Sequence, residues 1–251
     1  MRFRSIAFGL HLLASCVALT LILGTLYIAW YRWPGWYLTD VTKVTGVMAG
    51  VDVILGPLLT FLVASPKKPR RELTRDIAMI ATVQLCALIY GTVSLWNGRP
   101  LYYAFSEDVL QLVQAYDIDG DELALAHRQN APLVPHWYSV PRWIWAPLPQ
   151  DSSERSKIVT SAISGGDDVI SMPRYYQPWN SGLASLRTQL KKVDDVKYFS
   201  RPEKGILKER MQAAGIATDQ PNSMPLTGRG HPLLAVFDPA SLKITAILKS
   251  K

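Results

Sequence analysis

The sequence VTGVMAGVDVILGPLLTFLVASPKKPRRELTRDIAMIATVQLCALIYGTVSL, from Val44 to Leu95, determines how the chain is organised. It holds two apolar runs, at about 44–63 and 77–95, joined by a turn rich in lysine, arginine and proline. A helix rises about 1.5 Å per residue, so about 20 apolar residues cross the roughly 30 Å hydrocarbon core of a membrane. We therefore predict two transmembrane helices with a basic turn between them.

A third apolar run, at about 6–30, precedes this pair. The apolar region of a secretory signal is only about 7 to 15 residues long and ends at a cleavage site, whereas this run continues well beyond that length. We expect a retained first span, followed by a belt of tryptophan and tyrosine residues at 27–37 that is typical of the headgroup region. The connection to the second span is short, which predicts antiparallel neighbours. Residues 1–96 are thus predicted to form a three-span transmembrane helical domain.

Basic residues are distributed unequally between the two ends of the predicted spans. Positive-inside bias places the more basic side in the cytoplasm, and the N-terminus with it. Three spans then leave everything after Trp96 on the outer side, which for a bacterial inner membrane is the periplasm. The basic residues that set this topology are Lys67, Lys68, Arg70, Arg71 and Arg75, with Arg2 and Arg4 on the same side.

Residues 97–251 are predicted to form a small periplasmic α+β domain. Alternating aromatic and branched residues predict strands at 101–105 and 109–116, and a hairpin at 233–237 and 242–248. Helices are expected at 122–129, 152–164, 181–193 and 202–214. The proline- and tryptophan-rich segment 131–150 is expected to be irregular and pinned against the sheet or the membrane interface.

The charge distribution and the motifs exclude several function classes. The net charge is +7, of which +5 belongs to the part up to Leu95, so the basic excess reports topology and argues against a nucleic-acid partner. The acidic string beginning at Asp117 lacks the glycine and the glutamate that a calcium loop needs, and the four histidines show no metal spacing. No nucleophile or phosphate-loop motif is present in the sequence. We predict no metal, no cofactor and no enzymatic activity.

Asp52 is the first candidate for a functional residue. It lies about 12 Å into the bilayer, counted from the outer end of its span. An ionised acid there costs roughly 2.5–3.5 kcal/mol, so it should face protein. Gln84, in the third span, reaches a similar depth, and its amide is expected to donate a hydrogen bond to the carboxyl group. Three interpretations stay open: the pair holds the helices together, Asp52 contacts the membrane helix of a partner, or Asp52 handles protons or ions.

Glycines and a proline mark further candidate positions on the second span. Gly46 and Gly50 form a G-x-x-x-G pair, which lets helix backbones approach closely, either within the chain or with a foreign helix. Gly56 and Pro57 are expected to kink the span and to free backbone carbonyls that a neighbour must satisfy.

These features resemble the TfpX/TfpZ family of type IV pilin accessory proteins, which includes the FimB-like members. The likeness covers the whole chain, and its most specific part is the run GVDVILGPLLT at 50–60. It further includes the basic turn, Asp76, Gln84, Tyr90-Gly91 and Arg99-Pro100.

The resemblance implies an inner-membrane helper for a cognate type IV major pilin, which is anchored by one apolar helix with its head in the periplasm. Such a helper promotes stability or assembly of the pilin into surface pili by non-catalytic contacts, with the assembly machinery as a further partner and membrane lipids around its spans. Two rival hypotheses remain. One is a small transporter that uses Asp52, and the other is a periplasmic ligand sensor that acts through a membrane partner.

Overall fold

The computed structural model describes residues 2–251, which divide into two compact units. The helical unit comprises the residues up to Arg32 together with Asp40–Arg99. The sheet unit comprises Trp33–Thr39 together with Pro100–Lys251. The chain therefore crosses from one unit to the other three times, and a short segment between the first two apolar helices belongs to the sheet unit.

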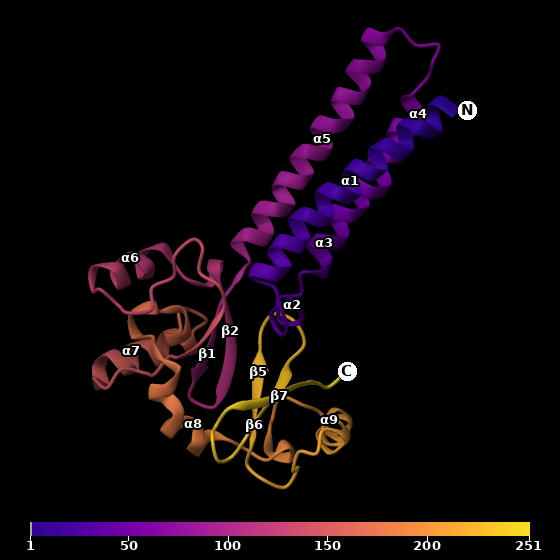
Figure 1. The fold of residues 1–251 in the computed structure, drawn as a ribbon. Helices are drawn as coiled ribbons and strands as arrows, with labels where there is room; N and C mark the ends of the chain where they lie inside the picture. Colours follow the sequence, from indigo (N-terminus) through magenta and orange to yellow (C-terminus); the bar gives the residue numbers. More distant parts are fainter. Residues whose placement is uncertain (1) are drawn as a thin grey trace. The chain divides into compact units, whose positions relative to one another are not determined.

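Three apolar helical segments make up the helical unit (Figure 1). They are α1 (Arg2–Ala29), the continuous series α3 (Thr42–Ala49), η1 (Gly50–Leu55) and α4 (Gly56–Val63), and α5 (Arg70–Asn97). All three segments are long and apolar enough to cross a membrane, as the sequence predicted. α1 packs mainly on α4, and α5 packs on α3 and α4, while α1 and α5 contact each other little. The middle segment is therefore the centre of the unit.

The sheet unit is built on one seven-stranded mixed sheet in the order β4-β3-β1-β2-β5-β6-β7. β3 runs parallel to β1 and β5 runs parallel to β2, while the remaining neighbours are antiparallel. The strands are β1 (Pro100–Ser106), β2 (Val109–Gln114), β3 (Arg142–Trp145), β4 (Gln177–Pro178), β5 (Ser223–Thr227), β6 (Leu233–Phe237) and β7 (Ile244–Lys249). The predicted combination of helices and sheet is confirmed, as are the strands that became β1, β2, β6 and β7.

Three strands were missed by the sequence analysis: β4, which is only two residues long, and β3 and β5, for physical reasons. β3 lies inside the segment 131–150, which we expected to be irregular, and its extended backbone is fixed by parallel pairing with β1. β5 contains Pro225, and a proline inside a short run argues against a strand because it cannot donate to the ladder. Both strands are set by pairing partners that are distant in the sequence.

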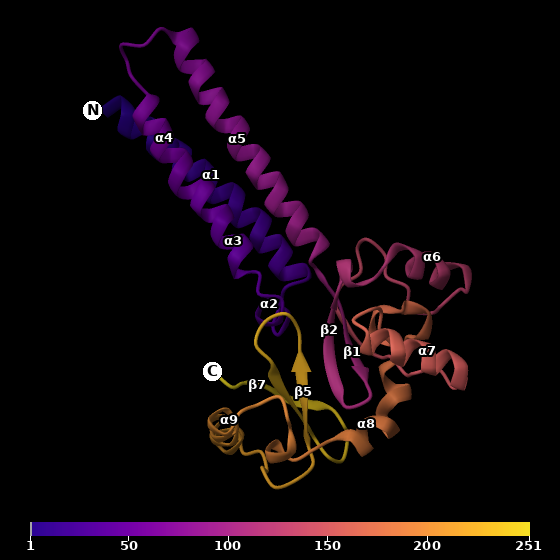
Figure 2. The ribbon, with the colours of Figure 1, turned by 180° about the vertical axis from the view of Figure 1, so that it is seen from behind.

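Helices lie beside the sheet in two groups. Figures 1 and 2 show α6 (Gly120–Arg128) and α7 (Ser152–Ile163) beside β1 and β2, and α9 (Arg201–Ala213) beside the strands of the C-terminal hairpin. Leu207 and Met211, one turn apart on α9, are buried with Leu234 and Val236 of β6. The shorter helices are α2 (Gly35–Leu38), α8 (Leu183–Gln189), η2 (Ala115–Asp117), η3 (Val169–Ser171), η4 (Pro173–Tyr175), η5 (Trp179–Gly182) and η6 (Val193–Asp195).

β1 is buried on both faces, so its side chains enter two different cores. Tyr103 and Phe105 belong to one hydrophobic cluster, whereas Tyr102 and Ala104 belong to another. The Tyr102 hydroxyl donates a hydrogen bond of 2.7 Å to the Leu133 carbonyl, and burial raises the pKa of Tyr102 to about 12, so the donor stays protonated at neutral pH. This contact pins the beginning of the segment 131–150 to the sheet.

The segment Trp33–Thr39 completes one core of the sheet unit. The Leu38 side chain is fully buried and clusters with residues of β1, β2, β5 and β6. The Gly230 N–H donates a hydrogen bond of 2.7 Å to the Leu38 carbonyl. A Cβ atom on Gly228 would lie 2.6 Å from the Leu38 carbonyl oxygen, and one on Gly230 would lie 2.2 Å from that of Tyr37. The two glycines therefore allow this close approach of backbones.

Aromatic side chains of the same segment hold the C-terminal strand. The Lys249 Nζ atom of β7 lies 4.9 Å from the ring centroid of Trp33 and 4.6 Å from that of Tyr37. Such cation–π contacts contribute about 0.5–1 kcal/mol at exposed sites. Two members of the aromatic belt that we expected after the first span thus pack within the sheet unit.

Leu38→Ala should destabilise the sheet unit by about 2–5 kcal/mol because it leaves a cavity in the core. The measurement is the unfolding transition of the full-length protein in detergent micelles, followed by tryptophan fluorescence. Leu38→Met is the matched control and should cost less than about 1.5 kcal/mol, since it nearly conserves volume. Equal transitions for Leu38→Ala and the unmodified protein would contradict a core role for this segment.

Candidate functional site

The middle helical segment changes its hydrogen-bond pattern at its centre. Residues Gly50–Leu55 form a π-helical stretch, and the Gly56 N–H donates to the Val51 carbonyl five residues earlier. Pro57 follows directly, and proline has no N–H and its ring clashes with the carbonyl four residues earlier in an α-helix. A π turn relieves this conflict by inserting a residue, and such turns are frequent at functional sites. The irregularity expected at Gly56 and Pro57 therefore takes the form of a π-helical stretch.

Gln84 of α5 satisfies the carbonyls of this π turn. Its Nε2 atom donates to the Val51 carbonyl at 3.4 Å and to the Asp52 carbonyl at 3.3 Å. The close approach depends on Gly56, because a Cβ atom there would lie 1.9 Å from the Gln84 Nε2 atom. The sequence analysis expected the Gln84 amide to donate to the Asp52 carboxyl group, and a side-chain hydrogen bond between Gln84 and Asp52 accompanies these main-chain contacts.

Two buried acceptors remain at the same position. The side chains of Asp52 and Gln84 are 5% and 8% exposed, and within residues 2–251 neither the Asp52 Oδ2 atom nor the Gln84 Oε1 atom has a hydrogen-bond partner. A buried acceptor without a donor costs about 1–3 kcal/mol, more when it is charged. This position therefore favours binding of a group that can donate a hydrogen bond to one of these two atoms.

Asp52 and Gln84 line a cavity of about 400 Å³ in the helical unit. The remaining lining comes from α1 and α5, so the cavity lies where these two helices contact each other little. At one end, the His11 Nδ1 atom lies 2.6 Å from the Thr60 Oγ1 atom of α4. The other lining residues are Ala14, Ser15 and Ala18 of α1 and Ala81, Leu85 and Leu88 of α5.

The predicted glycine pair lies apart from this cavity. A Cβ atom on Gly46 or Gly50 would meet no atom within 4 Å among the described residues, so neither glycine provides a tight contact inside the unit. Ala14 and Ala18 were not singled out from the sequence, although their spacing of four residues is the same small-residue pattern that drew attention to the glycines. A search for small residues in the first span would have found them.

The basic residues that were predicted to set the topology gather at the start of α5. Arg70, Arg71 and Arg75 lie in its first two turns, and Lys67 precedes it in the turn. Lys68 forms an ion pair with Asp76 of α5. The orientation they imply across a membrane stays a prediction.

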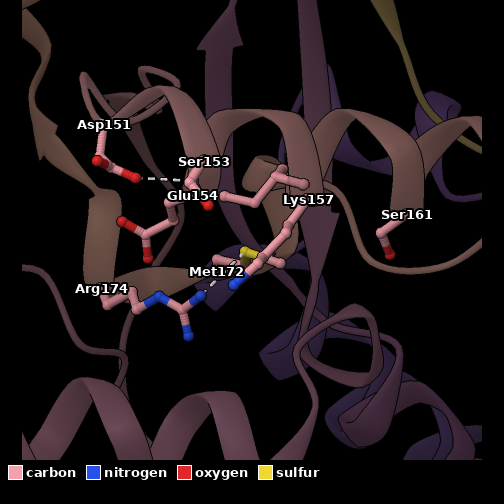
Figure 3. Close-up of a pocket in the computed structure, with 8 residues that line it drawn as sticks. Asp151, Ser153, Glu154, Lys157, Ser161, Met172 and Arg174 are labelled. Carbon is pink, nitrogen blue, oxygen red and sulfur yellow. Dashed lines mark hydrogen bonds between the residues drawn. The ribbon is translucent and has the colours of Figure 1, made fainter.

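A second pocket, of about 470 Å³, lies beside α7 in the sheet unit (Figure 3). Three of its four charged side chains, Asp151, Glu154 and Arg174, are engaged in internal contacts. The Asp151 Oδ1 atom caps α7 by accepting from the Glu154 N–H at 2.8 Å, and Arg174 donates to both carboxylate oxygens of Glu122 at 2.7 and 2.8 Å. The Tyr175 hydroxyl donates to the Glu154 carboxylate. These contacts tie α7, η4 and α6 together, which gives the charges of this pocket a structural role.

Metal-ligating side chains are also dispersed. Within residues 2–251, no three or more histidine, cysteine, aspartate or glutamate side chains are grouped so that they could hold a metal ion.

Comparison with known proteins finds relatives from Dichelobacter nodosus. The chain is 27% identical over 235 residues to the fimbrial assembly protein of serogroup E1, which covers 92% of this chain and 89% of the relative. The fimbrial assembly protein of serogroup I is also 27% identical, over 236 residues, with the same coverage. That of serogroups C1 and C2 is 34% identical over 118 residues, which is 47% of this chain and 90% of the relative. No protein-family model and no solved structure matches the chain.

Gly56→Ala should weaken the helical unit, because the added methyl group pushes the Gln84 amide away from the carbonyls of Val51 and Asp52. Gly46→Ala is the matched control, since it makes the same change in the same segment where nothing lies within 4 Å. We expect Gly56→Ala to be less stable than Gly46→Ala by about 1 kcal/mol or more. Thermal unfolding in detergent, followed by circular dichroism, measures the difference. Equal stability would show that the Gln84 contact contributes little.

Proposed function

We propose, since this chain belongs to the family of fimbrial assembly proteins, that it is a membrane accessory protein for a cognate type IV major pilin. It assists the stability of this pilin, or its assembly into surface pili, through non-catalytic, chaperone-like contacts. The observation that carries the proposal is the cavity in the helical unit, whose two unpartnered acceptors lie among small and apolar side chains. Such a surface suits the single apolar helix by which a type IV pilin is anchored.

The proposal includes a location for each unit. The three apolar segments span the bacterial inner membrane, with membrane lipids around them and with the N-terminus in the cytoplasm. The basic cluster at Lys67, Lys68, Arg70, Arg71 and Arg75 supports this orientation through positive-inside bias. The sheet unit is then periplasmic, on the side where the pilin head and the assembly machinery are reached. This arrangement agrees with the TfpX/TfpZ resemblance of the sequence.

A transport function is less well supported by the same cavity. An ion or proton pathway needs polar groups in series across the membrane. Around Asp52 and Gln84 the lining consists mainly of alanine and leucine, with Ser15 and His11 as its other polar residues. This composition favours packing of a helix.

A ligand sensor would need a receptive pocket in the sheet unit. The pocket beside α7 has its principal charged groups, Asp151, Glu154 and Arg174, engaged in contacts that stabilise the fold. A small charged ligand would have to break these contacts in order to bind. The accessory function remains the better account.

Deletion of the gene in its host should reduce surface pili, with total pilin measured in parallel by immunoblot. Complementation with the unmodified gene should restore the pili, whereas Asp52→Ala should not, because it removes an acceptor from the cavity. The matched control is Thr82→Val. Thr82 is an exposed residue of α5 whose hydroxyl only donates to the Ala78 carbonyl of its own helix. Unchanged surface pili and unchanged pilin in the deletion strain would refute the accessory function.

A further inference from the structure

We infer that the cavity between α1 and α5 binds an apolar membrane helix of the pilin that carries an N–H or O–H donor at the depth of Asp52. The inference rests on the proposed function and adds to it the chemistry of the group that is recognised. Its basis is a buried site between helices in which two acceptor atoms, Asp52 Oδ2 and Gln84 Oε1, have no donor within residues 2–251.

The donor requirement follows from how the Gln84 side chain is used. Its Nε2 atom donates to the carbonyls of Val51 and Asp52, and its amide also makes a side-chain hydrogen bond with Asp52, so its donors are already in use. The Gln84 Oε1 atom and the Asp52 Oδ2 atom remain, and both are acceptors when the carboxyl group is ionised. Both side chains are more than nine-tenths buried. One donor placed between them would satisfy an otherwise costly arrangement.

The depth of the site restricts where that donor comes from. Asp52 lies near the middle of a segment of 22 residues that is long enough to cross a membrane. Lipid chains have no hydrogen-bond donor, and headgroups lie at the ends of the spans. A polar group reaches the middle of the hydrocarbon on a helix, because only a helix satisfies its own backbone there. A donor on a partner helix is the matching chemistry.

The shape of the site also suits a helix. Ala14 and Ala18 of α1 and Ala81 of α5 border the cavity, and small residues let a helix backbone approach closely. Leu85 and Leu88 supply an apolar wall on the α5 side. The open face at Gly46 and Gly50 also has small residues, but the buried acceptor atoms of Asp52 and Gln84 line the cavity instead.

Asp52→Asn tests the chemistry of the site. The asparagine keeps the size of the side chain but replaces one acceptor oxygen by an NH₂ group, so it presents a donor where the carboxylate presents an acceptor. We expect pilin recovered with the tagged protein from detergent-solubilised membranes to fall about tenfold or more, at equal abundance of the tagged protein. If Asp52 only joins the helices of this chain, the near-isosteric asparagine should leave recovery unchanged.

Ala18→Leu tests the location of the docked helix, and it does so without altering the polar pair. The larger side chain fills the space beside Asp52 and should also lower pilin recovery. Val17→Leu is the matched control, because Val17 is the neighbouring residue of α1, is 50% exposed, and does not line the cavity. Its recovery should equal that of the unmodified protein. This pair of variants decides the location even if Asp52→Asn fails to accumulate.

The outcomes separate this inference from the proposed function. Normal recovery of pilin with Ala18→Leu, or with an Asp52→Asn protein of normal abundance, overturns the donor site while the accessory function stands. Failure of the unmodified protein to recover pilin overturns both. Recovery of a second, differently tagged copy of this chain in place of pilin, lost in Ala18→Leu, assigns the cavity to self-association and also overturns the inference.

Discussion

A buried backbone carbonyl that has lost its helical partner needs another hydrogen-bond donor, and the helical unit is organised around this constraint. Pro57 removes an N–H from the middle segment, and the π turn at Gly50–Leu55 shifts the remaining bonds. The Gln84 amide then approaches over Gly56 and donates to two of the displaced carbonyls. The contact between α5 and the middle segment therefore depends on a glycine, a proline and a glutamine acting together.

The same contact creates the candidate site. The Gln84 nitrogen is used by main-chain carbonyls and by the Asp52 side chain, and among residues 2–251 the Gln84 Oε1 and Asp52 Oδ2 atoms are left without a hydrogen-bond partner. The contact that satisfies the carbonyls of the π turn thus leaves two acceptor atoms beside it without a donor. In the proposed function, a partner helix supplies that donor.

The sequence predicted the parts of this arrangement that depend on composition and spacing. The apolar runs indicated three spans, and counting residues placed Asp52 and Gln84 at similar depth. The π turn shifts the register inside the span, so the atom to which Gln84 donates was not predictable from depth alone. In the sheet unit, β1 and β2 follow from local alternation, whereas β3 and β5 depend on strands far away in the sequence. Leu38 was likewise hidden, since a short connection between two spans carries no signal that one of its residues enters a distant core.

That buried leucine anchors the segment between the first two apolar helices in the core of the sheet unit. α1 borders the cavity through Ala14 and Ala18, and the chain that follows it enters the core of the sheet unit at Leu38. The sheet unit is therefore held through two separate connections, at Trp33–Thr39 and at Pro100, and the first is anchored by burial as well as by the peptide bond. Coupling between sites requires an element with two alternative arrangements, whereas a fully buried side chain favours a single one. The physical role of this segment is consequently to complete the core of the sheet unit.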